Sequence, residues 1–153
     1  MIKCFLAMLF CILCGMIITG RYKKKIALVE SLIRFNKSFL INVQYEKKTI
    51  PEFICEYEDE NVANLLQEVE LSKAEKRKVN LKNYVDKEIL KETENYFGVL
   101  GTSDSETQKN FLNSYGQVFE NKLTETQKRY SGLISAIPKI SILIGATFFI
   151  ALL

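Results

Sequence analysis

The chain of 153 residues is 48% hydrophobic and 25% charged, with 18 acidic residues, 21 basic residues, four cysteines and no histidine. That length suits one domain, and the missing histidine excludes histidine-dependent nucleophiles, histidine-containing zinc sites and histidine-ligated haem. A net charge of +3 is too small to indicate a nucleic-acid-binding protein. Every acidic residue lies between Glu30 and Glu125, so a polar middle separates two apolar ends.

The first apolar end, residues 4–20, carries no charge over 17 residues. This is the lower limit for crossing about 30 Å of hydrocarbon, and we expect residues 1–20 to form an N-terminal transmembrane helix. A secretory signal peptide is the alternative, because Lys3 provides a basic start. Four basic residues follow the apolar run directly and disfavour export: Arg21, Lys23, Lys24 and Lys25.

Three of the four cysteines lie within this apolar segment, and Cys11 and Cys14 have the C-x-x-C spacing of some metal and redox sites. We interpret them as small apolar side chains, because a charged thiolate in hydrocarbon is costly and the sequence has no second cysteine pair to complete a four-ligand metal site. Cys55 stands alone in the polar middle, so we expect no disulfide framework there.

The polar middle, residues 21–132, is predicted to be a small cytoplasmic helical bundle. Apolar residues recur at helical spacing from Ile26, which predicts an amphipathic helix of about 20 residues ending near Tyr45. Thr49 and Glu52 have the spacing of a capping box, so a short helix is expected to begin there and to fade in the acidic run 56–60. A further helix is expected from Asn61, with one apolar face formed by Val62, Leu65, Leu66 and Val69.

Residues 70–82 are mostly charged and are expected to form a solvated helix or linker. Helical spacing then resumes at Leu81, Tyr84, Val85, Ile89, Leu90, Tyr96, Phe97 and Leu100. Gly101 is expected to end this helix by adopting the left-handed backbone conformation. Ser103 and Glu106 are expected to form a second capping box, beyond which the longest helix extends toward the second apolar end. Because the sequence shows no sustained alternation of apolar and polar residues, as strands would, the predicted fold class is all-α.

The second apolar end, residues 133–153, is predicted to be a C-terminal transmembrane helix kinked at Pro138, with the Lys139 stem reaching back to the near interface. Any further role of Pro138 and Lys139 stays open. Lys122, Lys128 and Arg129 precede this segment. Because basic residues are retained on the cytoplasmic side, both flanks place the middle region in the cytoplasm.

No phosphate-binding loop and no G-x-G-x-x-G fingerprint is present in the sequence. The acidic run 56–60 lacks the glycine spacing of a metal-binding loop, and no nucleophile has a base partner. We therefore expect no catalysis, no cofactor and no metal, which leaves a scaffold or binding role.

The segment 95–108, NYFGVLGTSDSETQ, resembles a signature of the stage III sporulation protein AB family. The matching positions are Phe97, Gly98, Leu100, Gly101, Ser103, Asp104 and Gln108. Segments 43–45 and 50–52 resemble the stretch that precedes the second helix in this family. Asn42 stands where the family often has an acidic residue, and Ile140-Ser141 stands where leucine-glycine is expected. Residues 58–90 carry no recognisable signature, and their role stays open.

The resemblance implies a non-enzymatic platform subunit in the mother-cell membrane around the forespore, within the channel complex that spore formation requires. It also implies a soluble domain similar to that of the type II secretion and type IV pilus inner-membrane platform protein. The implied partners are membrane lipid and other stage III subunits, including a secretion-type ATPase, with no nucleic acid; homo-oligomerisation stays open. A membrane-anchored sensor or adaptor unrelated to sporulation is the alternative, whereas a pore would need polar residues lining the spans.

The turn from Leu100 to Gln108 is the expected partner-binding surface. Gly98 and Gly101 permit a tight backbone there, and Asp104 and Gln108 are expected to point outward. The alternative is that the same residues form only an ordinary corner between two helices.

Overall fold

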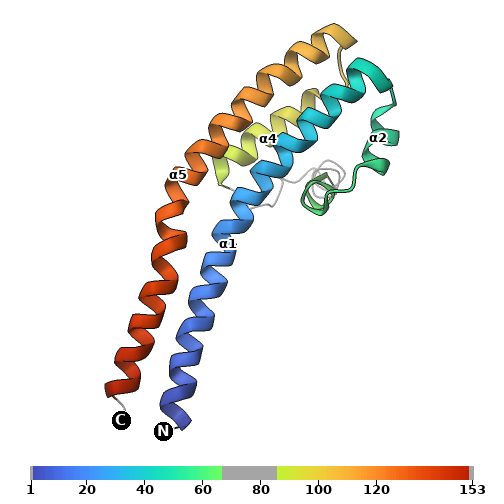
Figure 1. The fold of residues 1–153 in the computed structure, drawn as a ribbon. Coiled ribbons are helices and arrows are strands. Elements are labelled where there is room, and N and C mark those ends of the chain that lie inside the picture. The colour runs from blue at the N-terminus through green and yellow to red at the C-terminus, as the bar shows by residue number, and fades with distance from the viewer. Residues whose placement is uncertain (1, 67–85, 152–153) are drawn as a thin grey trace. The chain divides into compact units, whose positions relative to one another are not determined.

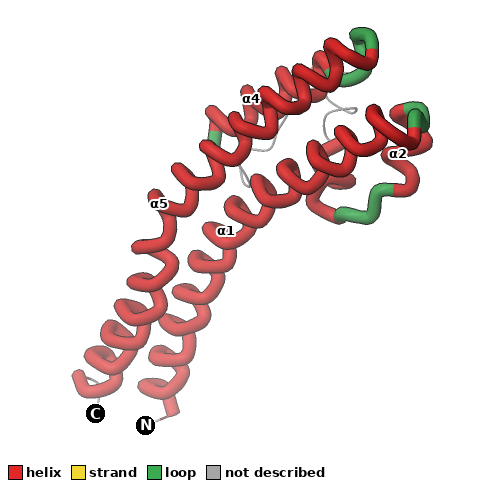
Figure 2. The backbone as a smooth tube through the Cα atoms, turned by 45° about the horizontal axis from the view of Figure 1, so that its top comes forward, coloured by secondary structure: helices red, strands yellow, loops and turns green. Residues whose placement is uncertain are grey.

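The computed structural model describes residues 2–66 and 86–151 and is helical throughout its regular structure (Figures 1 and 2). No strand occurs among these residues, which confirms the all-α prediction. In chain order the elements are α1 (Ile2–Ile41), the π-helical turn η1 (Asn42–Glu46), α2 (Ile50–Glu56), helical residues 60–66, α4 (Lys87–Val99) and α5 (Ser105–Ala151).

The chain divides into two compact units. The terminal unit consists of Met1–Ile26 together with Glu125–Leu153, and the central unit is Ala27–Thr124. The long helices α1 and α5 each contribute residues to both units. The predicted continuation of the last helix into the second apolar segment is therefore confirmed.

Within the terminal unit, the two apolar segments pack together through small residues. Gly15 is buried, and a β-carbon on it would overlap the hydroxyl of Ser141 and lie 2.7 Å from that residue's Cβ. Gly145 is likewise buried, and a β-carbon there would lie 3.1 Å from Cγ of Met8. Small residues at such contacts let helix backbones approach closely, which is the usual basis of helix association in lipid.

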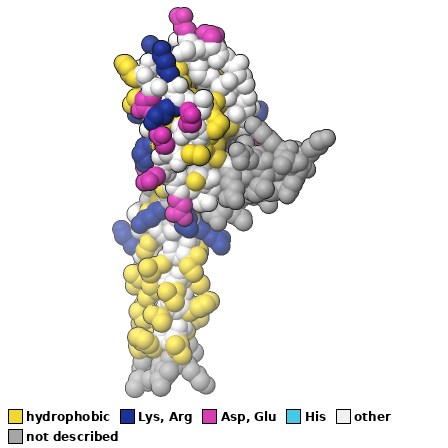
Figure 3. All heavy atoms as spheres, turned by 90° about the vertical axis from the view of Figure 1, so that its right-hand side faces the viewer, with side chains coloured by type: hydrophobic (Ala, Val, Ile, Leu, Met, Phe, Trp, Pro, Cys, Tyr) yellow, Lys and Arg dark blue, Asp and Glu magenta, His cyan; other side chains and the backbone are white. Residues whose placement is uncertain are grey.

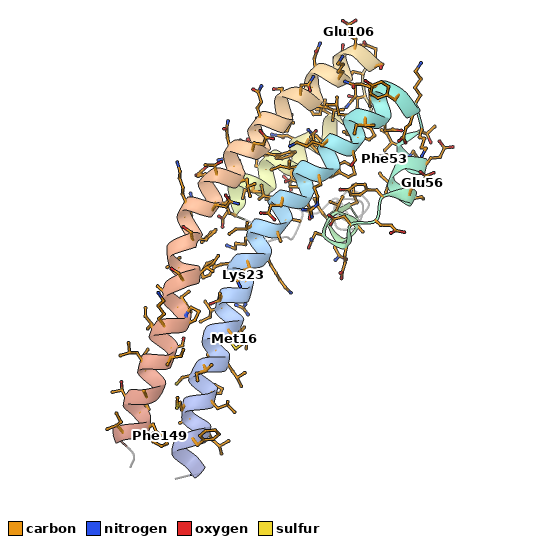
Figure 4. The ribbon with its side chains drawn as sticks, in the orientation of Figure 1. Met16, Lys23, Phe53, Glu56, Glu106 and Phe149 are labelled. Carbon is orange, nitrogen blue, oxygen red and sulfur yellow. The ribbon has the colours of Figure 1, made fainter. Side chains whose placement is uncertain are left out.

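Both α1 and α5 contain a stretch long and apolar enough to cross a membrane. Only 11% and 6% of these two stretches are buried, so they do not resemble the core helices of a soluble protein. Apolar side chains cover the face of the terminal unit that Figure 3 shows. Large apolar side chains of this unit are exposed, among them Phe10 at 68% and Leu143 at 69%. Figure 4 places Met16 and Phe149 on this part of the chain. α5 contains Pro138 within its length; the expected kink stays a prediction.

The central unit is built around an aromatic core contributed by α1, α2, α4 and α5. Phe35 on α1 lies 5.6 Å from Phe53 of α2 and 6.4 Å from Tyr96 of α4, ring centroid to ring centroid. Tyr96 in turn lies 5.2 Å from Phe119 of α5. Figure 4 shows Phe53 pointing from α2 toward α1, whereas Glu56 points away. Edge-on aromatic pairs of this kind add about 0.5–1.5 kcal/mol each beyond their buried area.

Most predicted boundaries agree with the structure. The first helix ends through η1, close to Tyr45, and Lys47 follows in the left-handed conformation with φ 54°. Thr49 and Glu52 form the predicted capping box, with the Thr49 N–H donating to Glu52 over 2.9 Å. The predictions for Val69, residues 70–82, Leu81, Tyr84 and Val85 lie outside the described residues.

Candidate partner-binding corner

The connection between α4 and α5 begins with a tight, glycine-dependent turn. α4 ends at Val99, and Gly101 has φ +77°, which confirms the predicted left-handed stop. The N–H of Thr102 donates to the carbonyl of Val99 over 3.2 Å. A side chain on Gly101 would also collide with Ile50, the first residue of α2. Glycine is therefore required here both by backbone conformation and by close packing.

Gln108 holds this turn from the inside. Its side chain is 3% exposed, so the expectation that it points outward is wrong. Its Oε1 accepts the N–H of Gly101 at 3.0 Å and the hydroxyl of Ser103 at 3.3 Å. Its Nε2 is buried and has no hydrogen-bond partner among the described residues. Gln108 thus fixes the backbone of the corner and is not part of the accessible surface.

Asp104 lies on the outside and caps α5. Its Oδ2 accepts the N–H of Thr107 at 3.2 Å, and hydrogen bonds from the Thr107 side chain and backbone lower the pKa of Asp104. The helix begins at Ser105. The expected capping box of Ser103 and Glu106 is therefore wrong, because Asp104, one residue further along, is the residue that caps the helix.

The accessible part of the corner is the segment 101–107, all of which is exposed. Leu100 is half-buried against the core. Glu106 lies at the start of α5, as Figure 4 shows. The surface thus offers backbone groups and the carboxylates of Asp104 and Glu106, which suit binding. That a partner binds there stays a prediction.

The neighbouring turn between α1 and α2 is closed by Asn42, whose role the sequence reasoning missed. Asn42 is 1% exposed, its Nδ2 donates to the carbonyl of Lys48 at 3.1 Å, and its Oδ1 accepts the Lys48 N–H at 3.1 Å. An amide side chain satisfies both groups, whereas a carboxylate can only accept. Tyr45, in the same turn, is 77% exposed. The Ile50–Gly101 approach brings this turn next to the α4–α5 corner.

A second missed residue, Asn36, connects three helices of the central unit. It is 2% exposed; its Nδ2 donates to the carbonyl of Leu112 at 2.9 Å and its Oδ1 accepts the Tyr96 hydroxyl at 3.1 Å. Burial raises the pKa of Tyr96, so its hydroxyl remains a donor. A polar residue on the apolar stripe of the first helix was the available signal.

Asp59 caps the helical residues 60–66. Its carboxylate accepts the N–H groups of Asn61 and Val62 at 3.0 and 3.4 Å and pairs with Arg34 at 3.1 Å. Partial burial raises its pKa, but hydrogen bonds from Arg34, Ser31 and the two backbone groups outweigh that effect, so the pKa of Asp59 is lowered. The acidic run thus contains a helix cap.

No group of three or more potential metal ligands occurs among the residues that the structure describes. Cys11, Cys14 and Cys55 are free thiols; the first two are half-buried and Cys55 is exposed.

These features define a class: an all-helical protein whose two terminal segments are candidate membrane spans and whose central unit is a small aromatic-cored bundle with rigid corners. The family model of stage III sporulation protein AB matches residues 1–153, the whole chain. The chain therefore belongs to the stage III sporulation protein AB family, and the resemblance noted at residues 95–108 is confirmed. No curated protein and no solved structure gives a significant match.

Proposed function

We propose that this chain is a non-enzymatic platform subunit of the membrane complex that connects mother cell and forespore during spore formation. The observation that carries the proposal is the family match, which spans both apolar segments as well as the central unit. The terminal segments anchor the chain in the mother-cell membrane. The basic residues that flank both segments favour a cytoplasmic central unit.

In this proposal the exposed corner 101–107 is the docking surface, and a secretion-type ATPase of the same complex is its partner. Two features support a docking role. The corner is fixed from the inside by Gln108, and Asn42 closes the neighbouring turn between α1 and α2, so binding would cost little ordering of the backbone. Its two exposed carboxylates, Asp104 and Glu106, would favour a partner with a basic patch.

The test uses Asp104→Asn with Glu106→Gln, because asparagine retains the helix cap while both charges are removed. Exposed Glu60 and Glu94, which have no hydrogen bond or ion pair with another described residue, provide a matched control when both are changed to glutamine. We expect the corner variant to weaken ATPase co-purification by about tenfold and to lower the count of heat-resistant spores. The control should leave both unchanged.

Equal ATPase association in the corner variant, the control and the unmodified chain would contradict docking at this surface. Normal spore formation in a strain lacking the chain would contradict the proposed function as a whole.

A further inference from the structure

The charges of the chain are divided unequally between the two units. The terminal unit contains eight basic residues and one acidic residue, Glu125, a formal net charge of +7. The central unit contains the other 13 basic and 17 acidic residues, a formal net charge of −4. A net charge of +3 for the whole chain therefore conceals a strongly basic terminal unit.

Most of this charge is gathered at one level of the terminal unit, which we call the basic collar. Tyr22 on α1 stacks on Tyr130 of α5 with ring centroids 4.9 Å apart. Lys25 donates to the Tyr130 hydroxyl at 3.4 Å, and its Nζ lies 5.2 Å from the centre of that ring. These contacts bring together basic residues from both helices: Arg21, Lys23, Lys24, Lys25, Lys128 and Arg129.

Four members of the basic collar are exposed and have no ion pair or hydrogen bond with another described residue: Arg21, Lys23, Lys24 and Lys128. Glu125, the acidic residue of the terminal unit, pairs with Arg129 at 3.0 Å. Arg21 stands three and four residues before Lys24 and Lys25, a spacing at which like charges on a helix repel. Among the described residues, the positive charge of Arg21, Lys23, Lys24 and Lys128 is therefore not neutralised by an acidic side chain.

The basic collar also lies where apolar surface begins. On α1 it follows directly after the charge-free residues 4–20, whose side chains Ile17 and Ile18 are 60% and 43% exposed. Dark-blue side chains gather at one end of the yellow apolar stretch in Figure 3. Tyrosines such as Tyr22 and Tyr130 are enriched where hydrocarbon meets headgroups. A ligand that fits both the basic side chains and the apolar surface beside them carries a negatively charged phosphate next to acyl chains.

We propose that the basic collar binds the headgroup phosphates of anionic phospholipids, with the acyl chains lying along the adjacent apolar side chains. This inference rests on the proposed membrane anchoring. Basic clusters immediately beside a transmembrane helix attract anionic lipid when their side chains are not already paired with acidic residues. Here the two helices supply that charge together, at a level fixed by the tyrosine pair.

The test is performed on the full chain purified in detergent. Phosphatidylglycerol or phosphatidylcholine is added, bound lipid is counted by native mass spectrometry, and the melting temperature is followed by circular dichroism. We expect phosphatidylglycerol to bind and to raise the melting temperature, because a ligand of the folded state stabilises it. Phosphatidylcholine, and inorganic phosphate at the same phosphate concentration, should do neither.

Two matched variants locate the site. Arg21→Gln with Lys24→Gln and Lys128→Gln removes three charges of the basic collar, and we expect phosphatidylglycerol affinity to fall by about tenfold to a hundredfold. Lys47→Gln with Lys91→Gln and Lys109→Gln removes three exposed charges of the central unit and should leave the affinity unchanged. A third variant that retains charge, Arg21→Lys with Lys24→Arg and Lys128→Arg, should bind as the unmodified chain does.

Equal affinity for the two lipids, or an equal loss in the two glutamine variants, would overturn the proposal. A response to inorganic phosphate as large as that to phosphatidylglycerol would overturn it as well. The measurements require neither the ATPase nor sporulating cells, so their failure is distinguishable from a failure of the platform role.

Discussion

Asn36 satisfies two buried groups with one side chain, and the stability of the central unit depends on that arrangement. Replacing Asn36 with leucine leaves the Leu112 carbonyl and the Tyr96 hydroxyl unpaired, so we expect the free energy of unfolding to fall by about 2–3 kcal/mol. Tyr96→Phe alone should lower it by about 1 kcal/mol. Denaturation of the full chain in detergent, followed by circular dichroism, measures both.

The double variant is the control for this assignment. With no hydroxyl left unpaired, Asn36→Leu combined with Tyr96→Phe should lower the free energy of unfolding by about 1 kcal/mol less than the sum of the single variants. Strictly additive losses would mean that the two side chains do not depend on each other.

Asp59 makes the stability of the central unit depend on pH. Its pKa is lowered in the folded state, so its contribution is fully present above the unfolded value of about 3.9 and is lost as pH falls through the lower folded value. Asp59→Ala should lower the free energy of unfolding by about 1 kcal/mol at pH 7, through loss of the cap. Thermal melts between pH 7 and pH 2.5 should show this difference shrink. A difference that is constant across that range would contradict the role of the carboxylate.

Single residues also show where sequence reasoning reaches its limit. The Thr49–Glu52 cap and the left-handed Gly101 follow rules that involve only three or four neighbouring residues, so both were predictable. The cap of α5 was misplaced by one residue because serine and aspartate are equally good caps. Gln108 was predicted to face outward, but its orientation depends on where the turn backbone lies after folding.

At the scale of elements, the pairing of the two apolar helices depends on Gly15. Gly15→Ala places a β-carbon 2.7 Å from Cβ of Ser141, so Ser141 or the helix that carries it must shift to accommodate the new group. We expect a loss of about 1–3 kcal/mol in the free energy of unfolding in detergent. Gly20→Ala is the matched control, because a β-carbon at Gly20 meets nothing within 4 Å. It should be neutral or slightly stabilising, since alanine favours helix more than glycine does. Equal melting temperatures for the two variants would contradict the helix contact.

The helical type of the described elements was predictable because each carries an apolar period or a charge-free run, but the helix expected over residues 1–20 and the helix expected from Ile26 form one helix, α1. The contacts between the helices were not predictable. Asn36 lies on the apolar stripe of α1, where a polar residue is conspicuous, but its partners Tyr96 and Leu112 are 60 and 76 residues away in the chain. Nothing local to Asn36 identifies residues so distant.

For the molecule as a whole, the central claim is that both ends of the chain are embedded and the central unit lies in the cytoplasm. The native cysteines suit a direct test: Cys55 is exposed in the central unit, whereas Cys4, Cys11 and Cys14 lie in the first apolar segment. In non-sporulating cells that express the chain in their plasma membrane, a membrane-impermeant maleimide added to intact cells should not label Cys55. After permeabilisation of the cells it should label Cys55, and Cys55→Ser should abolish that labelling. Labelling of Cys55 in intact cells would contradict the account.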